Sequence, residues 1–208
     1  MVEPGACRVN EAAGLRTALK EWAVLAQVMG EGRIIALVRK GGIRERRAGF
    51  VVRHDRFLVY PTFFHEKDAE LAERFRPMLA EAHARRPPEG AIRIELVCDV
   101  AGVWRVEDLD QLAGIEGEHG LTPDAVASRF HYRNEPGVQV VAVRVSRLSN
   151  PAVVPEVRRY LGCVSWVALD EAIPTEGATP VVSEEDFGQR LRELERVLGP
   201  ATPALQSP

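Results

Sequence analysis

Residues 33–65 read RIIALVRKGGIRERRAGFVVRHDRFLVYPTFFH, and this stretch decides the fold. A nearly continuous apolar run over residues 32–38 predicts a buried strand. After a basic connection that carries two glycines, the short apolar runs 50–53 and 56–60 predict that the sheet continues. Pro61 would end that strand or place it at the edge of the sheet. The stretch therefore predicts successive strands around a basic, glycine-bearing connection.

Further strands are predicted on both sides of the chain's midpoint. Residues 91–106 alternate in part between apolar and polar side chains, and residues 137–148 carry the clearest run of β-branched residues. Asn150-Pro151 is expected to open an irregular connection. The chain is then expected to return to β structure over residues 160–167.

Helices are predicted from apolar side chains that recur at helical spacing. Four segments have this pattern or a helix-start signal: residues 11–29, 68–86 with a kink or break at Pro77, 122–130 after the Thr122-Pro123 cap, and a last helix capped by Ser183. A short acidic helix or turn is expected over residues 107–112. We expect the helices 15–29 and 187–198 to pack outside the sheet.

These elements predict an α+β fold in a single domain over residues 11–199, with flexible termini at residues 1–10 and 200–208. We expect a mixed, mostly antiparallel sheet that curls towards a barrel. The 208 residues, 46% of them hydrophobic and 27% charged, suffice for one sizeable core. No apolar run is long enough to span a membrane, and the N-terminus does not resemble a secretory signal. We therefore expect a cytoplasmic protein.

The net charge of −3 is unevenly distributed along the chain. Residues 33–56 contain eight Lys or Arg and two acidic residues, so this segment carries about +6 and the remainder about −9. A local basic field on an acidic protein suits a phosphate or another anion. Because 24 of the 27 basic residues of the chain are arginine, a solvated, arginine-rich hairpin is the alternative interpretation.

Four polar residues are candidates for general acid–base chemistry: Lys40, Glu45, His54 and His65. A lysine, a carboxylate and a histidine in one pocket could move protons to and from a base or an amide. Whether these side chains converge is left open. His54 lies between two strand halves, where a histidine is more often structural. Cysteine and histidine spacing gives no metal-binding motif, and we expect neither a metal nor another cofactor.

Ligand contacts are expected from both polar and aromatic residues. The candidates are Arg39, Gly41, Gly42, Arg44, Tyr60, Thr62, Tyr132 and Trp166. Aromatic faces stack on bases while arginines hold phosphates. In the alternative interpretation Trp166 belongs to the core, and the two tyrosines, which have polar tips, lie at a rim.

Several short motifs together resemble one bacterial family. They are Lys20-Glu21-Trp22-Ala23, Arg39-Lys40-Gly41-Gly42-Ile43, His54-Asp55-Arg56-Phe57-Leu58, Tyr60-Pro61-Thr62, Phe64-His65 and Cys163-Val164-Ser165-Trp166. The set is similar to the domain of unknown function 1802, over roughly residues 18–170. The family brings no established activity.

The order of strands also resembles, more distantly, the small PUA-like barrels, which include ASCH and EVE domains. This resemblance implies a barrel that binds RNA or modified bases, and a few members hydrolyse modified nucleosides. ASCH domains carry a Lys-x-x-Glu-x-Arg pattern, whereas Glu45 lies two positions later after Lys40. Two hypotheses follow: a module that binds RNA or a nucleotide in a basic, aromatic-lined pocket, or a small hydrolase of a modified nucleoside or nucleic acid.

Overall fold

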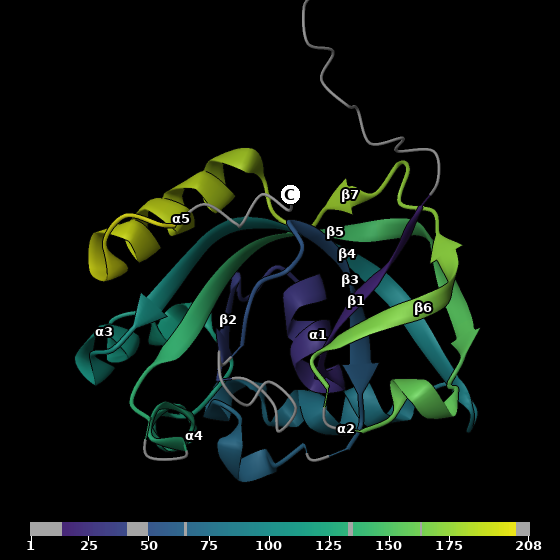
Figure 1. The fold of residues 1–208 in the computed structure, drawn as a ribbon, viewed down its shortest axis with the longest axis horizontal. Coiled ribbons are helices and arrows are strands. Elements are labelled where there is room, and N and C mark those ends of the chain that lie inside the picture. Colours follow the sequence, from purple (N-terminus) through teal and green to yellow (C-terminus); the bar gives the residue numbers. More distant parts are fainter. Residues whose placement is uncertain (1–13, 41–49, 65, 133–134, 163, 203–208) are drawn as a thin grey trace, which may run out of the picture.

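The computed structural model describes residues 14–40, 50–64, 66–132, 135–162 and 164–202. One sheet contains seven described strands (Figure 1): β1 (Leu15–Trp22), β2 (Ala36–Arg39), β3 (Arg56–Thr62), β4 (Ala91–Val106), β5 (Val138–Pro155), β6 (Trp166–Ile173) and β7 (Thr179–Pro180). The described α-helices are α1 (Ala23–Gly30), α2 (Pro77–Ala84), α3 (Leu109–Ala113), α4 (Pro123–Phe130) and α5 (Glu184–Leu198). Among these helices, none is long and apolar enough to cross a membrane.

The strands are ordered β2-β5-β4-β3-β1-β6, and β7 pairs with β5. Every pairing is antiparallel except that of β1 with β3. Figure 1 shows the sheet curving around α1, with α5 on its outer side. The predicted α+β class and the curled, mostly antiparallel sheet are confirmed. Within the described residues the sheet stays open rather than closing into a barrel.

The two longest strands, β4 and β5, pair along almost their whole length. Their alternating β-branched side chains place one set in the core, as the sequence predicts. The irregular connection expected from Asn150 is wrong, because β5 continues and Ala152 still pairs with Ile94. Pro151 is tolerated there since no described strand pairs with the other side of β5 at this point.

The helix predicted over residues 15–29 is wrong in its first half, which forms strand β1. Ala18 and Leu19 are both buried, in separate apolar clusters on opposite faces of the sheet. The chain becomes helical only at Ala23. Pairing with β3 on one side and β6 on the other therefore overrides the helical spacing of the apolar residues.

Smaller differences concern element boundaries. Pro77 begins α2 instead of kinking a longer helix, because its missing N–H costs nothing in the first turn. Strand β2 is shorter than residues 32–38 and pairs with β5, so it forms no hairpin with β3. The described residues of 50–55 and 160–165 contain no strand.

Two helix starts confirm their predicted caps. Thr122 Oγ1 accepts a hydrogen bond from the Ala125 N–H at 3.3 Å, and Ser183 Oγ accepts one from the Asp186 N–H at 3.0 Å. After α5, Thr202 exchanges two backbone hydrogen bonds with Val103 of β4. This pairing holds the end of the described chain against the sheet.

Candidate functional site

The parallel pair β1–β3 places the ends of two motifs side by side. In its register Lys20 lies opposite Tyr60, and Trp22 lies opposite Thr62. Because parallel strands run in the same direction, their carboxyl ends meet at the same edge of the sheet. The Lys-Glu-Trp and Tyr-Pro-Thr motifs thus form one wall.

A cavity of about 550 Å³ lies against this wall. The end of β2, part of α4 and the segment 156–165 contribute the other sides. Its charged and aromatic side chains are the cations Lys20, Arg39, Lys40 and Arg129, the acids Glu21 and Glu156, and the rings of Trp22, Tyr60, Phe64 and Tyr160. The cavity is therefore both basic and aromatic, and we call it the strand-end cavity.

A buried ion pair crosses this cavity from β2 to β1. Arg39 Nη1 lies 3.1 Å from Glu21 Oε2 and donates to the Lys20 carbonyl at 3.1 Å. Glu21, which is only 8% exposed, also accepts from the Trp22 N–H at 2.9 Å. In the sheet β5, β4 and β3 separate these two strands. Contact between them requires the sheet to curl, and the ion pair stabilises that curl.

Arg129 reaches the same wall from α4. Its guanidinium lies 5.3 Å from the centre of the Trp22 ring, and Nη1 donates to the Val38 carbonyl at 3.3 Å. Burial lowers the pKa of Arg129, while the Glu21 carboxylate raises it. An arginine remains protonated under these conditions. One side chain thus links α4, β2 and β1 and keeps a positive charge beside the cavity.

Lys20 and Glu156 both contact Tyr60. Lys20 Nζ lies 5.7 Å from the centre of the Tyr60 ring and donates to the Gly162 carbonyl at 3.0 Å. The Tyr60 hydroxyl donates to Glu156 Oε1 at 3.3 Å. Burial, followed by the nearby Glu156 carboxylate, raises the pKa of Tyr60. Tyr60 therefore stays a neutral hydrogen-bond donor at neutral pH.

The amine of Lys40 donates hydrogen bonds to backbone carbonyls. Nζ donates to the carbonyls of Phe130 at 3.1 Å, of Gly137 at 2.6 Å and of Glu135. Burial lowers the pKa of Lys40, and Arg105 lowers it further, whereas the Glu135 carboxylate raises it. The contacts fasten the end of β2 to the connection between α4 and β5. The acid–base role of Lys40 stays a prediction.

Arg39, Lys40, Tyr60 and Thr62 are the predicted site residues that the structure brings together around this cavity. Thr62 Oγ1 donates to the Glu21 carbonyl at 3.2 Å, which ties the two parallel strands at their ends. Five other candidates, Gly41, Gly42, Arg44, Glu45 and His65, lie outside the described residues.

Trp166, His54 and Tyr132 do not line the strand-end cavity. Trp166 stacks on Phe50 with ring centres 5.9 Å apart, and its Nε1 donates to the Val51 carbonyl at 3.1 Å. The His54 ring meets Trp166 edge-on at 5.2 Å, and burial lowers the pKa of His54. Tyr132 is 43% exposed. Trp166 and His54 therefore pack against each other, and their roles as site residues stay predictions.

Sequence reasoning missed Arg129, Glu156 and Tyr160. Arg129 comes from a helix, Glu156 from a segment predicted as an irregular connection, and Tyr160 from the start of a segment predicted as β structure. None of these segments carries a local signal for a site. Glu21 and Trp22 belonged to a noticed motif but were placed on a helix. In the structure this motif lies on strand β1, where Lys20 pairs with Tyr60.

Comparisons with known proteins give one family and one distant structure. No curated protein matches the chain. The crystal structure of ASCH from Zymomonas mobilis matches 86% of this chain and 94% of that chain, at 13% identity. Its TM-score of 0.39 is too low to support an inference. A family model described as "Domain of unknown function (DUF1802)" matches residues 18–193, most of the chain. The chain therefore belongs to the DUF1802 family.

Proposed function

We propose that the chain is a binding module for a nucleotide unit, either free or within single-stranded RNA, and that the strand-end cavity is its site. The observation that carries this proposal is the lining of one cavity by four cationic side chains, two carboxylates and four aromatic rings. Its volume of about 550 Å³ lies within the range of small-molecule sites. Bases stack on aromatic faces, and cations attract phosphates.

The exposed ring of Phe64 is the best stacking surface at this cavity. Phe64 is 56% exposed, although the Arg86 guanidinium lies 5.7 Å from its ring centre. Tyr60 is only 1% exposed, and the Arg129 guanidinium lies closer to Trp22, at 5.3 Å. Stacking a base on an aromatic side chain contributes about 1–3 kcal/mol and tolerates different bases. We therefore expect base binding at Phe64 with weak sequence preference.

The charges of the cavity favour an anionic ligand. Glu21 neutralises Arg39 by the ion pair described above, and Glu156 is the one other carboxylate among the described lining residues. Glu70 does not line the cavity but lies 3.9 Å from Arg129, so one positive charge remains in excess. A phosphate group would balance it, and its binding would weaken as salt screens the interaction.

The contacts of Lys40 favour a protein that binds its ligand without converting it. Lys40, the predicted proton-transfer residue, donates to three backbone carbonyls and must be protonated to do so. No contact among the described residues supports the hydrolase alternative. Incubation with modified nucleosides and short RNAs, followed by mass spectrometry, should reveal no product.

The test compares two lysines, because Lys20 lines the cavity and Lys67 does not. Fluorescence anisotropy with a short single-stranded RNA should show affinity that falls as salt rises. Lys20→Gln should weaken binding about fivefold, as expected for about 1 kcal/mol, and reduce the salt slope by about 0.7. Lys67→Gln removes the same charge from an exposed side chain and should change neither quantity. Equal affinity of both variants, or binding independent of salt, would remove this cavity from the proposal.

A further inference from the structure

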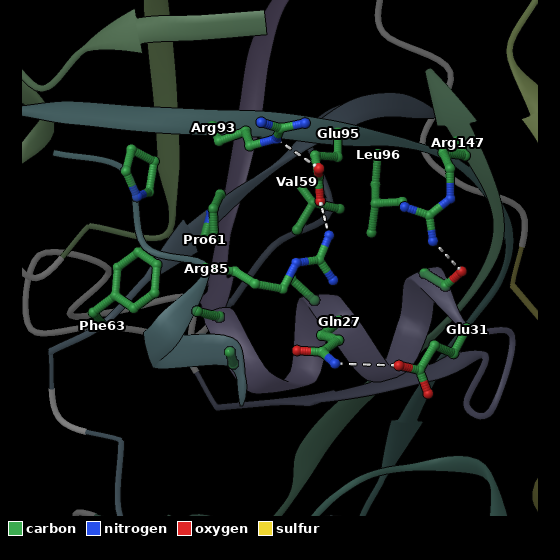
Figure 2. Close-up of a pocket in the computed structure, with 15 residues that line it drawn as sticks. Gln27, Glu31, Val59, Pro61, Phe63, Arg85, Arg93, Glu95, Leu96 and Arg147 are labelled. Carbon is green, nitrogen blue, oxygen red and sulfur yellow. Dashed lines mark hydrogen bonds and ion pairs between the residues drawn. The ribbon is translucent and has the colours of Figure 1, made fainter. Parts of the chain in front are cut away.

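A second cavity, of about 330 Å³, is lined by the residues that Figure 2 draws as sticks. Pro61 and Phe63 line it, whereas Thr62 and Phe64 line the strand-end cavity. This division follows from the alternation of side chains along extended backbone. Helix α1 forms the floor of the second cavity in Figure 2, so we call it the helix-floor cavity.

Three arginines and two glutamates give the helix-floor cavity a net positive charge. Glu95 lies between two of the arginines, 2.7 Å from Arg93 Nε and 3.5 Å from Arg85 Nη2. Arg147 donates from Nη2 to the carbonyl of Gly30, at the end of α1, at 2.8 Å. With Glu31 as the second acid, one positive charge remains unbalanced among the described lining residues. A singly charged anion would balance it.

Gln27 adds a buried acceptor without a donor. Its Nε2 donates to Glu31 Oε1 at 3.2 Å, which fixes the orientation of the amide. The Oε1 atom, on the same amide, is buried and accepts no hydrogen bond from any described residue. Buried polar atoms are nearly always paired, so this oxygen calls for a donor, which a water or a ligand group can supply.

We propose that the helix-floor cavity binds a small organic monocarboxylate that carries a hydroxyl or amine donor. Its carboxylate would pair with the arginines, and charge-assisted hydrogen bonds of this kind are among the strongest in proteins. Its donor would bind Gln27 Oε1 once a rotation of the amide opens this oxygen, which is closed to solvent, to the cavity. Between these ends, Val59, Pro61 and Phe63 offer an apolar wall for the carbon skeleton. The site is distinct from the strand-end cavity and does not depend on its function.

Three probes separate the contributions of the two polar ends: 4-hydroxybenzoate, benzoate, which lacks the donor, and phenol, which lacks the carboxylate. Titrations followed by amide and side-chain NMR should give saturable shifts centred on α1 and the Gln27 amide. We expect dissociation constants near roughly 1 mM, as for ligands of this size. 4-Hydroxybenzoate should bind about fivefold more tightly than either partner probe.

Two variants assign these differences to residues. Gln27→Leu should abolish the preference for 4-hydroxybenzoate over benzoate. Arg85→Gln, at a half-exposed position, should reduce the preference for 4-hydroxybenzoate over phenol. Lys20→Gln, in the other cavity, should leave all three affinities unchanged. Melting temperatures identify any variant that fails to fold. The absence of saturable shifts with every probe up to about 10 mM would overturn the proposal, as would unchanged preferences in both folded variants.

Discussion

Replacing Glu21 by Gln removes the carboxylate that joins β1 to β2 across the strand-end cavity. The side chain keeps its size, and its amide oxygen can still accept from the Trp22 N–H. What disappears is the negative charge 3.1 Å from Arg39 Nη1, which also compensates Arg129. Arg39 would then lie largely buried without its counter-ion.

The cost follows from the burial of this pair. Removing one partner of a buried ion pair destabilises a protein by about 3–5 kcal/mol, because the other charge stays desolvated. The side chains of Arg39 and Glu21 are 16% and 8% exposed, so some solvent reaches the arginine. We therefore expect Glu21→Gln to lower the free energy of unfolding by about 3 kcal/mol, at the lower end of that range.

Urea denaturation at neutral pH measures this loss as a lower midpoint with an unchanged slope. Glu107→Gln is the matched control, since Glu107 is 71% exposed and pairs with the half-exposed Arg105. It should change stability by less than about 0.5 kcal/mol. If Glu21→Gln were as mild as this control, the ion pair would not stabilise the curl of the sheet, and that part of our reasoning would be refuted.

Two further predictions concern buried positions outside the cavity. Burial lowers the pKa of His119 to about 4, and its Nδ1 accepts a hydrogen bond from the Leu121 N–H. The unfolded chain binds this proton at higher pH than the folded chain does. As pH falls from 7 to 4, the free energy of unfolding of wild type should therefore drop by about 3 kcal/mol relative to that of His119→Gln. A Cβ at Gly120 would overlap the buried Leu25 side chain. Gly120→Ala should therefore cost about 1–3 kcal/mol in thermal unfolding, whereas Gly117→Ala, with open space around it, should be nearly neutral.

Much of the fold follows from local patterns. The β-branched alternation of β4 and β5 and the capped stripe of α5 are properties of their own residues, so sequence reasoning finds them. Residues 15–22 are different, because Leu15, Leu19 and Trp22 fit a helical face as well as a strand. Pairing with β3 and β6, both distant in the chain, decides the outcome, and no local signal reports it.

The candidate site likewise contains residues that local sequence predicts and residues that only the tertiary structure brings in. Arg39 and Lys40 at the end of one strand, and Tyr60 and Thr62 at the end of another, could be predicted as neighbours of a ligand. Glu156 completes the cavity because the sheet curls and the chain after β5 returns to the ends of β1 and β3, which is a property of the tertiary structure.

Photo-crosslinking tests the proposed binding site most directly. Wild type would be irradiated with a short single-stranded RNA that contains thiouridine, and the modified residues identified by mass spectrometry. The strand-end cavity predicts adducts on Phe64 or Trp22, which excess unlabelled RNA should suppress and Lys20→Gln should reduce. Adducts confined to residues that do not line this cavity, or adducts that persist unchanged in Lys20→Gln, would contradict the proposal.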